Sequence, residues 1–187
     1  MKAAIIYWSK GGNTEKVALA IKEGFETSGG QVSFLKTSAA NYLDWFDNDL
    51  VCIGFPSYQW HPPEEVDTYL KNKLGGYRQQ GRIKPSSPKV SGKNALVFCT
   101  YSGPHTGINE AIPAGKYVGQ FFDHLGFTVL DEWYVVGKFH GSEVNSTQGR
   151  LGDIRDRPNQ EDMKKIREDT MNLVKRVSIP LQQSQKN

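Results

Sequence analysis

Three short, almost uninterrupted apolar runs constrain the fold of this chain more than any other feature. They read AAIIYW at residues 3–8, LVCIGF at 50–55 and ALVFCT at 95–100. A strand with one face in water alternates apolar and polar residues, whereas a strand of a parallel sheet is apolar throughout when helices cover both faces. We therefore predict a parallel sheet between two layers of helices.

The other segments alternate with these runs as an α/β sheet requires. The predicted strands are Ala3–Trp8, Gln31–Lys36, Leu50–Phe55, Asn94–Thr100 and Phe127–Gly137. Between and after them, apolar residues at helical spacing predict helices at 14–28, from Pro62 onward, from Pro113 onward, and after a capping Asn159. The sequence thus predicts a three-layer, doubly wound α/β fold with five parallel strands.

The length of 187 residues is typical of one domain, so we expect a single domain over 1–187. Residues 75–92 and 138–158 match no element and are expected to be long loops, and residues 180–187 are expected to fray. No run approaches the roughly 18 apolar residues of a membrane span. We expect a cytoplasmic protein that binds neither membranes nor nucleic acid.

The net charge of +3 comes from one short stretch. Its cations are Arg78, Arg82, Lys84, Lys89 and Lys93, with no acid among them. A solvated flexible loop explains such a stretch, and a docking surface for an acidic partner is the alternative. The two cysteines, Cys52 and Cys99, lie inside apolar runs and read as core residues. Neither they nor the four histidines have the spacing of a metal site.

The six residues after the first strand form the most informative motif. A loop that leads from a strand into a helix presents unpaired N–H groups and about half a positive charge, which favours an anion. Glycines let the backbone approach the ligand, and Ser, Asn and Thr add donors. Neither the Walker spacing nor the GxGxxG spacing occurs in the sequence. The predicted phosphate-binding residues are Ser9, Lys10, Gly11, Gly12, Asn13 and Thr14.

Aromatic residues follow the third and fourth strands at the same edge of the predicted sheet. Aromatic faces bind a flat ring well, and backbone groups can reach its polar edge. The candidates after the third strand are Pro56, Ser57, Tyr58, Gln59 and Trp60. Those after the fourth are Thr100, Tyr101, Ser102, Gly103, His105 and Thr106.

These three loops together resemble the flavodoxin-like family, from the first strand to the last helix. The string SKGGNT resembles the FMN phosphate loop of flavodoxins, and GFPSY followed by PPE resembles the second flavin loop of the longer members. The resemblance implies strand order 2-1-3-4-5 and FMN at the switch point between the first and third strands. Carried over by position, 9–14 would hold the phosphate, and 56–60 and 100–106 the two sides of the ring.

The sequence departs from short-chain flavodoxins in two ways. It has no Gly between Gly54 and Gly75, where those proteins carry one whose peptide turns toward the reduced ring, so we do not expect that device here. Its net charge is positive, whereas flavodoxins that shuttle electrons are typically strongly acidic.

We therefore expect an FMN-binding protein that transfers electrons to or from a redox partner protein. The first alternative is an FMN-dependent NAD(P)H or quinone reductase, in which residues near His105 and the 138–158 loop would cover a substrate. The second is a flavin-free binding module. No catalytic residue is assigned. Receiver, small-phosphatase and esterase motifs are absent, and the oligomeric state stays open.

Overall fold

The computed structural model describes residues 1–178 and contains one five-stranded parallel sheet. Its strand order, β2-β1-β3-β4-β5, confirms the predicted order. Each strand lies within two residues of its predicted position. The strands are β1 (Lys2–Tyr7), β2 (Gln31–Lys36), β3 (Leu50–Pro56), β4 (Asn94–Tyr101) and β5 (Thr128–Val136). The expectation of a frayed end at 180–187 falls outside the described residues.

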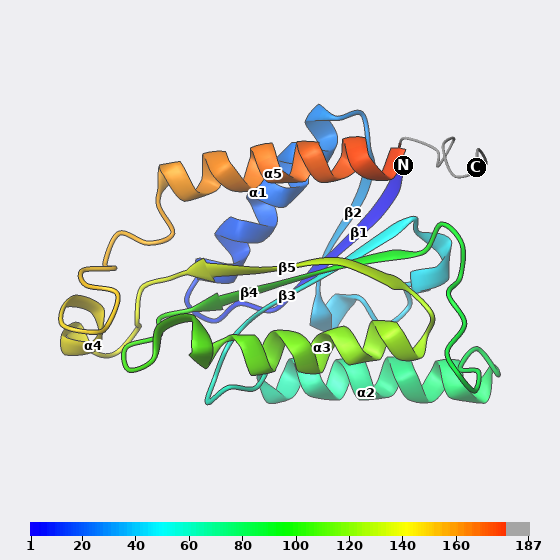
Figure 1. Cartoon of the computed structure of the whole chain (residues 1–187), viewed down its shortest axis with the longest axis horizontal. Coiled ribbons are helices and arrows are strands. Elements are labelled where there is room, and N and C mark those ends of the chain that lie inside the picture. The colour runs from blue at the N-terminus through cyan, green and yellow to red at the C-terminus, as the bar shows by residue number, and fades with distance from the viewer. Residues whose placement is uncertain (179–187) are drawn as a thin grey trace, which may run out of the picture.

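Helices cover both faces of the sheet, as Figure 1 shows. The helices α1 (Asn13–Thr27) and α5 (Gln160–Ser178) pack on one face, and α2 (Glu64–Gln79) and α3 (Ile112–His124) pack on the other. The short helix α4 (Glu143–Thr147) lies beyond the carboxyl ends of the strands, at the left of Figure 1. The predicted three-layer α/β architecture is therefore confirmed.

The apolar runs fill the two cores that this arrangement creates. In β1, β3 and β4 almost every residue is buried, because alternate side chains point to opposite helical layers. Ile5, Cys52 and Phe98 face α1 and α5, whereas Ile53 and Cys99 face α2 and α3. Both cysteines are fully buried core residues, as predicted.

Two helix starts show how local sequence sets the elements. Asn159 caps α5 as predicted, since its Oδ1 accepts the N–H groups of Glu161 and Asp162. Asn13 and Thr14 are residue types that commonly cap a helix, but the cap of α1 is Gly12. Gly12 adopts φ 90°, a conformation that glycine allows and an L side chain resists.

The expected loop at 75–92 begins later than predicted, because α2 continues through Gln79. Gly75 and Gly76 disfavour a helix, but Tyr77 is buried against Trp45 and donates its hydroxyl to Asp44 at 2.9 Å. This tertiary contact extends the helix. The predicted loop at 138–158 also contains the short helix α4.

Three of the five cations of the basic stretch are bound within the chain. The guanidinium of Arg82 lies 4.5 Å from the ring of Phe46. Lys89 donates to Asp123 at 2.9 Å, and Lys93 donates to the carbonyl of Asn48 at 3.0 Å. Much of this positive charge therefore holds the chain together at the amino end of the sheet.

Among residues 1–178, no helix is both long enough and apolar enough to cross a membrane. In the same part of the chain, no three His, Cys, Asp or Glu side chains lie close enough together to hold a metal ion.

Candidate functional site

A cavity of about 550 Å³ opens at the carboxyl ends of β1, β3 and β4. Open parallel sheets bind ligands at this edge, where the strand order changes direction. Every predicted site residue except Gly12 lines the cavity. The lining also includes residues that were not predicted individually, namely Pro104, Glu110, Lys138, Phe139, His140 and Asn145. The last four belong to the 138–158 loop, which the reductase alternative placed over a substrate.

The first wall of the cavity is the turn between β1 and α1. Ser9 Oγ accepts the N–H of Gly12 at 3.1 Å, which fixes the turn and leaves the hydroxyl hydrogen of Ser9 available to a ligand. The first backbone hydrogen bond of α1 runs from Lys16 N–H to Gly12 C=O. The N–H groups of Asn13 and Thr14 precede it and have no partner within the helix, so they favour an anion.

A buried pair of hydroxyls lies beneath this turn. Thr14 Oγ1 and Thr100 Oγ1 are 2.8 Å apart and join the first turn to the end of β4. One hydroxyl donates to the other, so one hydroxyl hydrogen of the pair remains for another acceptor. The prediction placed both residues at the site, and both line the cavity.

The second wall is the tight turn after β3. Tyr58 and His61 exchange two backbone hydrogen bonds, of 2.9 and 3.0 Å, across a two-residue turn. The central residues Gln59 and Trp60 have φ of 49° and 65°, so both are in the left-handed region without being glycine. Tyr58 is 47% exposed and Trp60 is 61% exposed. This turn therefore holds two aromatic side chains out of the core at the cost of backbone strain.

The third wall is the loop after β4, and carboxylate and hydroxyl groups hold it in place. Glu110 Oε1 accepts the N–H groups of His105 and Thr106 at 2.8 and 2.7 Å. Ser57 of the second wall donates its N–H to the carbonyl of Thr100 and its hydroxyl to the carbonyl of Glu110. The second and third walls are therefore joined, and the cavity between them is preformed.

The tyrosines of the site are neutral donors at neutral pH. Burial, and next the charge of Glu65, raise the pKa of Tyr58 above its ordinary value. Burial also raises the pKa of Tyr101, an effect that the nearby Arg157 opposes. Neither phenol presents a negative charge to a ligand in the cavity.

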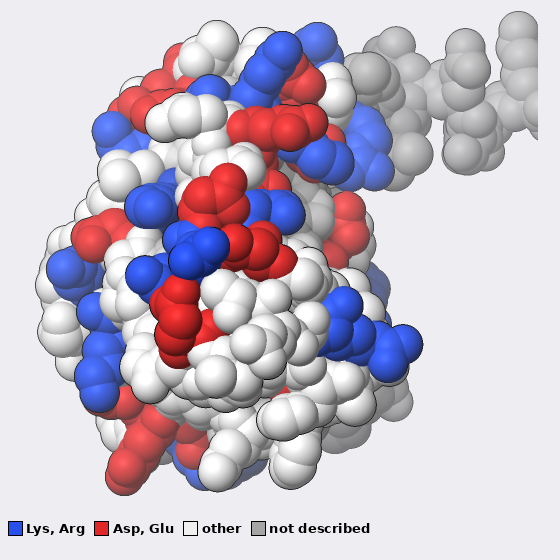
Figure 2. Space-filling view, turned by 90° about the vertical axis from the view of Figure 1, so that its left-hand side faces the viewer, with Lys and Arg blue, Asp and Glu red and all other residues white. Residues whose placement is uncertain are grey.

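The fourth wall comes from residues 138–157, which we call the strap. Lys138, Phe139, His140 and Asn145 of the strap line the cavity. Figure 2 faces this end of the molecule. Charged side chains of both signs gather over the upper half of this face, and uncharged residues form most of its lower half.

The match to protein families agrees with this arrangement. The family model described as Flavodoxin matches residues 5–169. A flavodoxin of Clostridium beijerinckii is 30% identical over 97 residues, which are 52% of this chain and 62% of that protein. An uncharacterized protein of Methanocaldococcus jannaschii is 26% identical over 177 residues, 92% of this chain but 36% of that protein. The matches thus span less than two thirds of both relatives.

Solved structures show the same fold at low identity. A flavodoxin from the domain Archaea superposes with a TM-score of 0.65 and 15% identity, covering 96% of this chain and all of that one. The flavodiiron core Flv1 of Synechocystis superposes with a TM-score of 0.60 and 19% identity, covering 95% of this chain and 36% of that one.

Proposed function

This chain belongs to the flavodoxin family, and from that premise we propose that its cavity binds FMN noncovalently and that the bound flavin transfers electrons to or from a redox partner protein. The flavin would supply the redox chemistry, and the chain would bind and orient it. We also propose that residues 1–187 form one domain and that the protein works in the cytoplasm, where free cysteines such as Cys52 and Cys99 are common.

One observation carries the FMN proposal, namely that the three predicted loops converge on one cavity. Its volume of about 550 Å³ falls in the range of about 300 to 1,000 Å³ that small-molecule and cofactor sites occupy. The two ends of the cavity differ in the way that FMN requires. Unpaired N–H groups and hydroxyls at 9–14 suit a phosphate, and the aromatic residues Tyr58, Trp60 and Tyr101 suit a flat ring.

Fluorescence quenching of FMN by the purified chain tests this proposal, and two glycines provide matched variants. Gly12 and Gly29 have φ of 90° and 76°, and open space surrounds both positions. Alanine at either position should destabilise the fold by about 1 kcal/mol through backbone strain. Only Gly12→Ala should weaken FMN binding, since Gly29 follows the opposite end of α1. Unquenched FMN with the unmodified chain would refute the proposal and leave the flavin-free binding module.

An FMN-dependent NAD(P)H or quinone reductase is the second candidate. The strap supports it, because Phe139 and Asn145 add an apolar and a polar group to the cavity beside the His105 loop. Anaerobic titration of the FMN-loaded protein separates the two functions. Bleaching of the flavin by NAD(P)H alone would support the reductase, and reduction only by a protein donor would support the carrier.

A further inference from the structure

Hydrogen bonds join the strap to two of the other walls of the cavity. Asn13 of the first wall donates its side-chain N–H to the carbonyl of Lys138 at 3.0 Å. Arg150 donates its backbone N–H to the carbonyl of Pro104 in the third wall at 2.8 Å. Inside the strap, the hydroxyl of Ser146 donates to the carbonyl of Phe139 at 3.0 Å. These bonds fix the position at which residue 140 meets the cavity.

His140 lies directly on the first turn. A Cβ on Gly11 would overlap Cδ2 and Nε2 of the His140 ring, so the imidazole occupies the space that glycine leaves open. The ring also lines the cavity. Gly11 and His140 together therefore bring an imidazole nitrogen to the turn whose N–H groups favour an anion.

The charged groups around this end of the cavity favour an anion as well. Lys10 and Lys138 line the cavity beside His140. Of the acids near this end, Glu143 and Asp153 pair with Arg155 at 2.8 and 2.6 Å, and the Glu110 carboxylate accepts the N–H groups of His105 and Thr106. Glu64 and Glu65 lie in a neighbouring hollow, which Ser9 and Lys10 also line. The lining of the cavity itself therefore carries two lysines and one carboxylate, Glu110, which is already hydrogen-bonded, so its charges favour an anion.

We infer that His140 of the strap binds the phosphate of the flavin nucleotide and makes the site select FMN over riboflavin, its dephosphorylated form. This inference rests on the proposed function. It assigns phosphate recognition to a residue about 130 positions beyond the phosphate loop. The imidazole N–H would add a hydrogen bond to a charged acceptor, and Lys10 and Lys138 would strengthen it through their charge.

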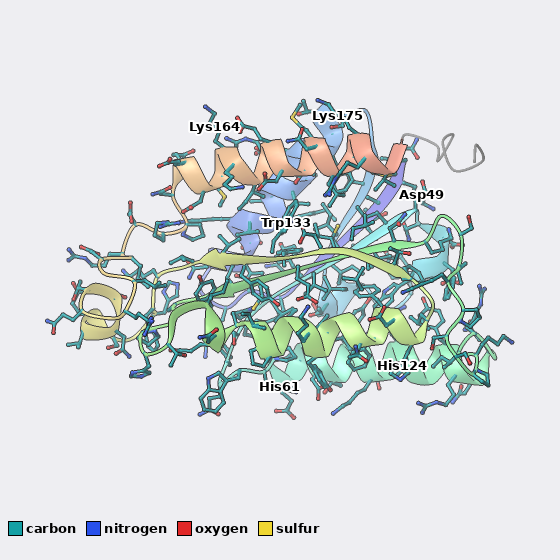
Figure 3. The ribbon with its side chains drawn as sticks, viewed as in Figure 1. Asp49, His61, His124, Trp133, Lys164 and Lys175 are labelled. Carbon is teal, nitrogen blue, oxygen red and sulfur yellow. The ribbon has the colours of Figure 1, made fainter. Side chains whose placement is uncertain are left out.

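The test compares the dissociation constants of FMN and riboflavin, measured by fluorescence quenching. His140→Phe keeps a ring on Gly11 but removes both ring nitrogens, and it should weaken FMN binding about tenfold while riboflavin binding stays unchanged. His140→Gln restores an N–H donor and should recover part of the loss. His124→Phe is the control, because His124 is exposed in the last turn of α3, far from the strap in Figure 3. It should change neither constant.

Each other outcome has a definite meaning. Equal weakening of FMN and riboflavin by His140→Phe would show a structural role and overturn the inference, as would unchanged FMN binding. If the unmodified chain binds riboflavin and FMN equally, the inference fails while flavin binding stands. If it binds neither, the proposed function fails first.

Discussion

Two tryptophans are built into this molecule in opposite ways. Trp45 is 1% exposed, its ring stacks on Phe122 at 4.9 Å, and its backbone N–H and indole N–H donate to Tyr77 and Tyr69 at 2.7 and 3.1 Å. Trp60 is 61% exposed and has a left-handed backbone with φ 65°. Trp45 thus stabilises the fold, whereas the exposed side chain and the left-handed backbone of Trp60 contribute no stability to it.

The comparison extends to the regions around these residues. We call Trp45, Tyr69, Tyr77, Phe122 and Phe127 the aromatic cluster; it lies between the sheet and the α2 and α3 layer. Its polar atoms are paired and its apolar surface is buried. The Tyr58–His61 turn contains the same residue types but exposes them at the rim of a cavity. Aromatic content alone therefore does not distinguish a site from a core, and the two groups differ in exposure and in backbone strain.

The largest expected difference between the two regions is in the free energy of unfolding when each tryptophan is replaced by alanine. Trp45→Ala leaves a large cavity in the aromatic cluster and should lower the free energy of unfolding by about 4 kcal/mol. Trp60→Ala removes an exposed side chain and should change it by less than about 0.5 kcal/mol. Urea unfolding measures both values. Similar losses for the two variants would contradict the comparison.

High pH should weaken the aromatic cluster. Burial raises the pKa of Tyr69 and of Tyr77 above the unfolded value of about 10. The folded chain therefore binds these protons more tightly, and the stability they contribute is present below pH 10 and is lost as the pH rises toward the folded pKa. At pH 11 each of these tyrosines should lower the free energy of unfolding by about 1 kcal/mol, because its hydroxyl ionises in the unfolded chain and stays protonated in the folded one.

Two variants test the alkaline loss. Tyr77→Phe should show a smaller decrease in the free energy of unfolding between pH 9 and pH 11. Tyr42→Phe changes a phenol that is 79% exposed and should leave the decrease unchanged. An identical pH dependence in all three proteins would mean that Tyr77 ionises as easily in the folded chain as in the unfolded one.

The Tyr58–His61 turn should affect the affinity for FMN and not the stability of the fold. Trp60→Ala should weaken FMN binding about tenfold, because stacking of an aromatic side chain on a flat ring contributes about 1 to 3 kcal/mol. Tyr42→Ala removes an aromatic residue that is also exposed but lies outside the cavity lining, and it should leave FMN binding unchanged. Titration of FMN fluorescence checks both. Unchanged affinity in Trp60→Ala would separate the strained turn from the ligand.

The smallest expected effect concerns the strain itself. Gln59→Gly should raise the free energy of unfolding by about 0.5 kcal/mol, because the relief of left-handed strain exceeds the entropy cost of glycine. Gln120→Gly is the matched control: it lies inside α3 and should lower stability by about 1 kcal/mol. Equal losses in the two variants would show that the turn at Gln59 is unstrained.

The sequence predicted the sheet well because its strands are defined by local pattern. The runs in β1, β3 and β4 are apolar on both faces, and turn residues end each of them. The last turn of α2 was missed, since Gly75 and Gly76 disfavour a helix locally and the stabilising contact of Tyr77 is made with residues about 32 positions earlier in the chain. A contact at that separation leaves no periodic signal.

The candidate site likewise contains residues that local sequence predicted and residues that it did not. The three loops that follow strands were predicted, because parallel strands place their carboxyl ends at one edge of the sheet. The 138–158 loop was expected at the site only in the reductase alternative, and Lys138 and His140 were not predicted individually, because bonds such as that from the Asn13 side chain to the carbonyl of Lys138 position them across the fold. A partial signal was present: a long polar segment directly follows a strand at the ligand-binding edge, and such loops are commonly functional.

The most direct test of the account is an NMR titration of the ¹⁵N-labelled chain with FMN, with the tryptophan indoles and the backbone amides followed together. We predict that the amides of Gly11–Thr14 and the indole of Trp60 shift and saturate at one FMN per chain, while the indole of Trp45 stays in place. Absence of any shift at 11–14 and at Trp60, or shifts centred on Trp45, would contradict the claim that the exposed loops form a flavin site on a separate, rigid core.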